Sequence, residues 1–203
     1  MRYLIAALLL SLSANTFAQD RILKMSGHEF EGKITEVSDF VVVCEIIKKN
    51  GKTKELSFPR SDVFSIQKEG QEEEIFYAKD EFIGDELSVQ EMRLYIAGEQ
   101  DALAGYDPRP TQYVGLLVGM GAGVYSQGGI ILPLAVPVGY TLLQTLPTIK
   151  IREETIQDPN HRFNEIYASG YESVARSKKI LGGLKGSAVG VAAGMIFYAL
   201  IPR

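Results

Sequence analysis

Two runs of glycine at every fourth position constrain this chain more than any other feature. The first run is Gly115, Gly119 and Gly123, and the second is Gly182, Gly186, Gly190 and Gly194. Residues four apart are neighbours on one face of an α-helix, so each run predicts a bare stripe along a helix. In water an interior glycine costs about 0.5–1 kcal/mol relative to alanine, whereas in lipid such a stripe lets two backbones approach closely. The sequence therefore predicts a membrane protein whose helices pack through these glycines.

The N-terminus has the pattern of a secretory signal peptide over residues 1–18. Arg2 precedes an apolar segment at 4–12, and Thr16-Phe17-Ala18 places small residues at the positions that a signal peptidase inspects. We therefore expect cleavage before Gln19 and export of the chain that follows. An uncleaved membrane anchor is the alternative.

Residues 19–80 have the pattern of a small, exported, all-β domain. The expected strands are 22–25, 30–37, 40–47, 54–58, 64–67 and 75–77. Asn50-Gly51, between two of them, is a strong hairpin signal. Short strands at this density predict a small barrel of the SH3 or Sm-like type, in which closure protects the strand edges. The single cysteine, Cys44, lies in a β-branched segment, where we expect a buried and unreactive thiol.

An acidic amphipathic helix and linker follow the β domain at residues 81–110. Ser88-Val89-Gln90-Glu91 forms a capping box at the start of this helix, and Pro108 and Pro110 end it. The segment carries seven acidic residues against two basic ones. We expect its acidic face to be solvated.

Residues 111–149 contain no charged residue, a run of 39 that is long enough for two membrane spans. The natural turn lies at 126–129. Prolines in the second half predict a kinked or partly broken helix, and a re-entrant hairpin is the alternative to two spans. A polar loop and helix at 150–179 then precede a third span at 180–203, whose apolar stretch at 180–201 is interrupted only by Lys185 near one end.

A weak internal repeat links the two glycine stripes. Tyr95-Ile96-Ala97-Gly98 precedes the first stripe, and Tyr167-Ala168-Ser169-Gly170 precedes the second. If 111–149 crosses twice, the acidic helix (81–107) and the basic one (176–185) share one side of the membrane and dock through opposite charges. The basic residues would then lie outside, against the positive-inside rule. An odd number of crossings, pairing with acids, or an outer membrane would each resolve that conflict.

The sequence offers no catalytic or metal-binding set. It contains two histidines and one cysteine. On a strand His28 points away from Glu29 and Glu31, and His161 lies in a turn that Asp158 is expected to cap. We therefore predict no catalytic, cofactor-binding or metal-ligating residues and no cofactor. The net charge is −4, without the dense basic surface of a nucleic-acid-binding protein, so we predict no nucleic-acid partner.

Several motifs form a recognisable pattern. They are the segments 22–27, 32–37 and 60–66, then Tyr95, Gly98, Asp101 and Ala102, and later Gly170, Tyr171, Ala175, Lys178 and Lys179. This pattern resembles uncharacterised Bacteroidota envelope proteins, in which an exported β domain precedes a Tyr-x-x-Gly-x-x-Asp-Ala segment and a glycine-rich membrane segment. The resemblance implies a place in the bacterial cell envelope, and the family brings no established activity.

The combined prediction is an α+β membrane protein, with a small N-terminal β-barrel followed by a glycine-packed transmembrane helical bundle. Its expected function is non-enzymatic: a membrane-anchored cell-envelope protein, surrounded by lipid, that presents the β domain to a protein or cell-wall partner. The alternative is a homo-oligomeric glycine-zipper pore or channel. An enzyme ranks third, and the sequence does not separate inner from outer membrane.

Overall fold

The computed structural model describes residues 19–48, 51–80, 86–126, 129, 131–146 and 149–200. The chain divides into two compact units, residues 1–86 and residues 87–203. It is an α+β protein, because a six-stranded antiparallel sheet in the first unit is followed by four α-helices in the second. The predicted signal peptide lies outside the described residues.

The first unit is an antiparallel sheet with the strand order β4-β3-β2-β1-β5-β6. Its strands are β1 Asp20–Lys24, β2 Glu29–Val37, β3 Val41–Ile47, β4 Thr53–Pro59, β5 Val63–Gln67 and β6 Glu74–Ile75, with a 3₁₀ turn at Arg60–Asp62. Gly51 of the predicted hairpin has a φ of 74°, and Asn50 lies outside the described residues. The described pairings leave β4 and β6 as edge strands, so closure into a barrel stays a prediction.

Alternating apolar residues form the core of the sheet. Ile22 of β1 is the centre, because it pairs with Phe30 of β2 on one side and with Ile66 of β5 on the other. Around it lie the buried residues Val42, Cys44, Phe58 and Val63. Cys44 is fully buried and unpaired, as predicted, and burial raises the pKa of its thiol, which disfavours the reactive thiolate.

The second unit begins with α2 (Val89–Gly105) and α3 (Arg109–Tyr125). The predicted capping box is confirmed: Ser88 Oγ accepts a hydrogen bond from Glu91 N at 3.3 Å, and Ser88 N donates to Glu91 Oε2 at 2.8 Å. As expected, α2 ends before the two prolines, and Pro110 occupies the first turn of α3.

The chain then forms α4 (Ile131–Leu143), two 3₁₀ turns at Glu153–Thr155 and Pro159–Phe163, and α5 (Glu165–Leu200). Asn164 Oδ1 caps α5 by accepting from the backbone nitrogens of Ile166 and Tyr167. This helix has 36 residues, about 54 Å at 1.5 Å per residue, and it continues without a break through position 180.

Among the described residues, α5 is the one helix that is long and apolar enough to cross a membrane. Helix α3 has 17 residues and α4 has 13, about 25 Å and 20 Å, against a hydrocarbon core of about 30 Å. Whether residues 111–149 cross twice or re-enter therefore stays a prediction.

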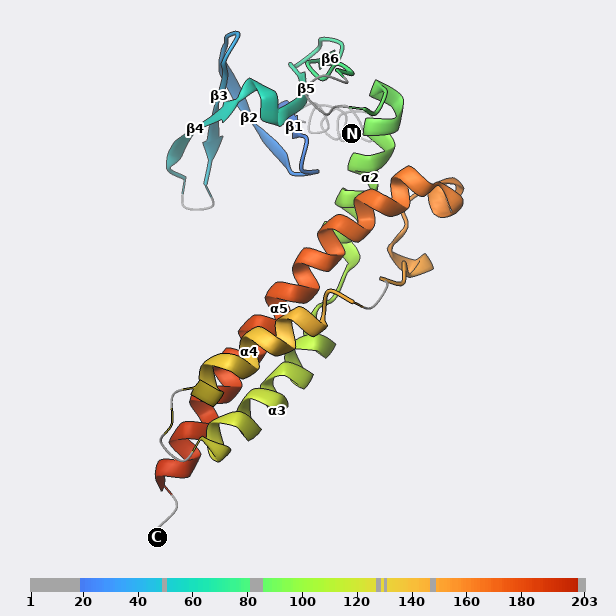
Figure 1. The fold of residues 1–203 in the computed structure, drawn as a ribbon. Coiled ribbons are helices and arrows are strands. Elements are labelled where there is room, and N and C mark those ends of the chain that lie inside the picture. The colour runs from blue at the N-terminus through green and yellow to red at the C-terminus, as the bar shows by residue number, and fades with distance from the viewer. Residues whose placement is uncertain are drawn as a thin grey trace, which may run out of the picture. The chain divides into compact units, whose positions relative to one another are not determined.

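Helices α2 and α3 together lie along α5 (Figure 1). The first half of α5 packs against α2 and its second half packs against α3, and both pairs run parallel. Helix α4 returns antiparallel to α3, and Tyr140 of α4 donates a hydrogen bond to the Thr111 carbonyl at 3.0 Å. In the second unit α5 thus packs in parallel against α2 and then against α3, and the shorter α4 packs against α3 and α5.

Candidate functional site

The structure places the two glycine stripes against each other, between α3 and α5. A Cβ atom added at Gly119 would overlap the Ser187 carbonyl oxygen and lie 2.9 Å from the Val191 nitrogen. A Cβ atom added at Gly190 would in turn overlap the Leu116 carbonyl oxygen. It would also lie 2.8 Å from the nitrogen of Met120. Each of these two glycines therefore admits the backbone of the other helix.

The contacts of the two stripes are reciprocal. Adding 71 to each residue number on α3 gives the matching residue on α5: 119 becomes 190, 116 becomes 187 and 120 becomes 191. Gly115 and Gly186, and Gly123 and Gly194, obey the same relation. Gly182 differs, because the nearest neighbours of a Cβ atom added there are side-chain atoms of Pro108 and Gln112, and the Pro108 carbonyl oxygen is farther away at 3.4 Å. The two helices are thus related by a local two-fold axis.

The segments of the predicted internal repeat also meet each other. A Cβ atom at Gly98 of α2 would overlap the Tyr167 carbonyl oxygen of α5, and a Cβ atom at Gly170 would overlap the Tyr95 carbonyl oxygen. Here the shift is 72, since 95 becomes 167 and 98 becomes 170. The sequence repeat therefore corresponds to two helix segments that cross each other symmetrically.

Helix α3 and the second half of α5 bury mainly small residues and expose large apolar ones. The buried positions of α3 are Gly115, Gly119, Ala122 and Gly123. In contrast, Leu117 on α3 is 67% exposed, Leu134 on α4 is 63% exposed and Ile196 on α5 is 62% exposed. Large exposed apolar surfaces mark contact with lipid or another protein. This distribution is the reverse of that expected for a water-soluble helical bundle.

Lys178 binds the carbonyl groups at the end of α2, where the chain turns into α3. Its Nζ atom donates to the carbonyl oxygens of Ala102 at 3.2 Å, Leu103 at 2.7 Å and Tyr106 at 3.3 Å. These carbonyls belong to the end of α2, where the last turn of a helix carries partial negative charge, and the Ala102 carbonyl also accepts from Tyr106 N at 3.1 Å. One ammonium group on the continuous helix therefore stabilises the interrupted one.

Replacing Lys178 with methionine should leave those carbonyls without a charged donor. We expect a loss of about 1.5–3 kcal/mol in the stability of the helical unit, the usual range for hydrogen bonds to a charged group. Lys179→Met is the matched control, because no described carboxylate lies within ion-pair distance of its ammonium group. Thermal unfolding followed by circular dichroism at 222 nm measures the difference, and equal melting temperatures for the two variants would contradict this assignment.

The other basic residue of this segment, Arg176, also serves a helix end. Its Nη1 atom donates to the Thr145 carbonyl at 2.7 Å, just beyond α4, and its Nη2 atom lies 3.5 Å from Glu172 of its own helix. The expected docking of α2 and α5 through opposite charges thus takes another form. Arg176 and Lys178 of α5 bind carbonyl groups at helix ends instead of the acidic side chains of α2.

Two acids of α2 are buried, which corrects the prediction of a solvated acidic face. Asp101 is 4% exposed, and its Oδ2 atom accepts from the Tyr167 hydroxyl at 2.6 Å and from Gln157 N at 3.0 Å. Burial, together with this hydrogen bond, raises the pKa of Tyr167. Asp101 therefore faces α5, and it also fastens the loop before α5 to α2.

Glu99 is the second buried acid, and it has an unsatisfied atom. The residue is 6% exposed, and its Oε2 atom has no hydrogen-bond partner among the described residues. Burial raises the pKa of Glu99 to about 7. A carboxyl group in such a place favours its neutral form, because the charged form loses its hydration.

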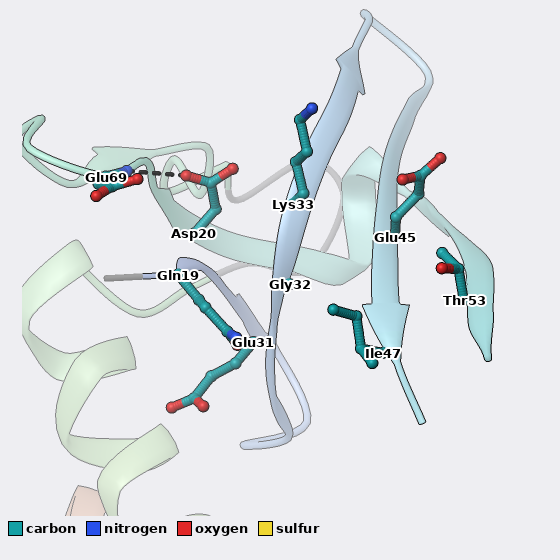
Figure 2. A pocket seen from close by; sticks show the side chains of 9 residues that line it. All are labelled: Gln19, Asp20, Glu31, Gly32, Lys33, Glu45, Ile47, Thr53 and Glu69. Atoms are coloured by element: carbon teal, nitrogen blue, oxygen red, sulfur yellow. Dashed lines mark hydrogen bonds between the residues drawn. The ribbon is translucent and has the colours of Figure 1, made fainter. Parts of the chain in front are cut away.

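The β unit carries an acidic surface pocket of about 440 Å³ (Figure 2). Its lining includes Asp20, Glu31, Glu45 and Glu69 against the single basic residue Lys33. Asp20 Oδ2 accepts from Ile34 N and its Oδ1 from Glu69 N, both at 2.8 Å. Both oxygens are thus used to fasten β1 to its neighbours. In Figure 2 the other acidic side chains do not converge on one point, and the described residues contain no metal-binding group.

His161 lies in a turn, as predicted, whereas His28 lies in the connection just before β2 and not on the strand itself. His28 Nδ1 lies 3.1 Å from the Ser26 carbonyl oxygen. His161 Nε2 lies 3.6 Å from Asp158 Oδ2, and Asp158 caps this turn by accepting from Asn160 N. Each histidine contacts its own local segment, and neither belongs to a described metal-binding group.

Comparison with protein-family models, with curated proteins and with solved structures finds no match. The resemblance to Bacteroidota envelope proteins stays a prediction. The residues that organise the helical unit are therefore known from its geometry: the reciprocal glycines, Lys178 and Asp101.

Proposed function

We propose that this chain is a non-enzymatic, membrane-anchored protein of the bacterial cell envelope. In this proposal α3, α4 and the second half of α5 lie in lipid. The β unit is exported and binds a protein or cell-wall partner. The single observation that carries the membrane assignment is the reversed distribution of side chains in α3 and the second half of α5.

Lipid explains that distribution because it removes the usual reason to bury large apolar side chains. In a bilayer the outer Leu, Ile and Val side chains contact acyl chains, and association between helices depends on close backbone packing by small residues. In water the same outer surface would promote aggregation. The apolar stretch of α5, with its buried Gly186, Gly190 and Gly194, fits the first situation.

The reciprocal contacts favour the anchor over the pore. In the alternative function, a glycine-zipper pore, the stripes hold neighbouring subunits together. Here Gly119 and Gly190 are each covered by the backbone of the partner helix within one chain. Faces already occupied in this way are not available to a second subunit.

A charge on the outer face tests the membrane assignment. Val189 is 59% exposed and lies near the middle of the apolar half of α5. A lysine at the centre of a membrane helix costs about 2.5–3.5 kcal/mol on insertion, whereas on a water-facing surface it is tolerated. We expect Val189→Lys to lower the amount of protein that resists carbonate extraction from membranes.

Phe40→Lys is the matched control, because Phe40 is 86% exposed in the β unit. It should leave membrane retention unchanged. Full solubility of the wild-type chain without detergent, or equal retention of both variants, would contradict the membrane assignment. A single cysteine at Leu117 in a Cys44→Ser background tests the pore: efficient disulfide-linked dimers in membranes would favour the oligomeric alternative.

A further inference from the structure

A second pocket, of about 540 Å³, lies in the helical unit beside the break between α2 and α3. Its walls come from the α2–α3 connection (Tyr106), from the first turn of α3 (Thr111), from the segment after α4 (Lys150, Arg152) and from α5 (Lys179). The nearby Lys178 is occupied by the carbonyls at the end of α2. Residues from three separate segments of the helical unit therefore line the pocket.

In each of these segments, the residues that line the pocket lie where a polar stretch of sequence meets an apolar one. Thr111 is the first residue of the uncharged run, and Lys150 directly follows its last residue. Lys179 directly precedes the apolar half of α5. If the apolar helices lie in lipid, the pocket is at the depth of the lipid headgroups.

The charges of the pocket are predominantly positive. Lys150, Arg152 and Lys179 face one acid, Asp107. The carboxylate of Asp107 accepts from Arg109 N at 3.0 Å, and its Oδ1 atom lies 3.8 Å from Arg109 Nε, so its charge is offset locally. Among the described residues, no carboxylate lies within ion-pair distance of the three basic side chains.

We propose that this pocket binds a phosphate group, supplied by the headgroup of an anionic phospholipid. Three cationic side chains and the Tyr106 and Thr111 hydroxyls are the donors that a phosphate diester requires. The apolar surface of α3 and α4 below the pocket accommodates the acyl chains. The lipid source rests on the proposed function, whereas the phosphate chemistry rests on the pocket alone.

The test uses full-length protein in a non-ionic detergent. Short-chain phosphatidylglycerol, short-chain phosphatidylcholine and inorganic phosphate are titrated separately, and bound molecules are counted by native mass spectrometry. The pocket variant is Lys150→Gln, Arg152→Gln, Lys179→Gln. The control variant, Lys33→Gln, Lys48→Gln, Lys54→Gln, removes the same charge from exposed positions of the β unit. Circular dichroism melting establishes that both variants are folded.

We expect the pocket variant to bind phosphatidylglycerol at least about tenfold more weakly than wild type, and the control variant to bind it within about twofold. Equal affinities of the two variants would overturn the site. Binding of inorganic phosphate as tight as that of the lipid would overturn the lipid source. Carbonate extraction of the wild-type chain reports separately on the membrane assignment, so failure of that assignment is distinguishable from failure of the pocket.

Discussion

Gly119→Leu should disrupt the pairing of α3 with α5. A leucine side chain would have to occupy the space of the Ser187 carbonyl, which is backbone and cannot rotate away. The two helices must then separate along their whole contact, and we expect a destabilisation of about 3 kcal/mol or more. Gly190→Leu should have the same effect, because its contacts are the symmetric counterpart. Melting of detergent-solubilised protein, followed at 222 nm, measures the change.

Gly121→Leu provides an unusually close control, two residues away on the same helix. A Cβ atom at Gly121 has no neighbour within 4 Å, and the residue is exposed. Leucine has a higher helix propensity than glycine by about 0.8 kcal/mol, so this variant should melt at the wild-type temperature or above. Equal destabilisation by the substitutions at 119 and 121 would show that the stripe does not form the contact described here.

Glu99→Gln should stabilise the helical unit at neutral and alkaline pH. Burial raises the pKa of Glu99 from 4.5 to about 7, so the folded state holds the proton more tightly than the unfolded state. Unfolding then releases a proton, and wild-type stability falls as pH rises from 4.5 to about 7 and stays low above it. The full difference is about 3 kcal/mol. Glutamine, which has no charged form, removes this loss.

The measurement compares wild type and Glu99→Gln in denaturant unfolding at pH 4 and pH 8. We expect nearly equal stabilities at pH 4 and a clear advantage for the glutamine variant at pH 8. Glu154→Gln is the control, because it makes the same substitution at an exposed position of the same unit. The same difference in stability between wild type and Glu99→Gln at both pH values would contradict the raised pKa of Glu99 in the folded state.

Features that depend on local periodicity could be predicted from the sequence. The strands of the β unit, the capping box at Ser88 and the end of α2 before Pro108 all follow from short patterns. The two stripes and the repeat around Gly98 and Gly170 were visible as spacing alone, and the structure places their members in contact. In each case the pattern is a spacing of residues along one face of a single helix or strand.

Features that depend on which elements meet could not be predicted. The burial of Asp101 depends on Tyr167 of α5 and on Gln157 lying against α2, whereas acidic residues on a helix are normally solvated. The role of Lys178 requires the end of α2 to lie beside the middle of α5, 72–76 residues away in the chain. The sequence changes from polar to apolar at position 180, which predicts a boundary between two helices there. The helix continues instead, because its backbone hydrogen bonds are satisfied whatever the polarity of its side chains.

If the apolar half of α5 lies in lipid, as proposed, the continuity of α5 makes it a rigid lever between the lipid and the water. Its polar half, residues 165–179, is about 22 Å long and has no hinge that separates it from the apolar half. Membrane helices tilt by about 20° on average, and a change of that size in the apolar half would displace the start of α5 by about 8 Å. Changes in bilayer thickness would therefore reach the outer end of this helix as a movement, together with the α2 segment that packs against it.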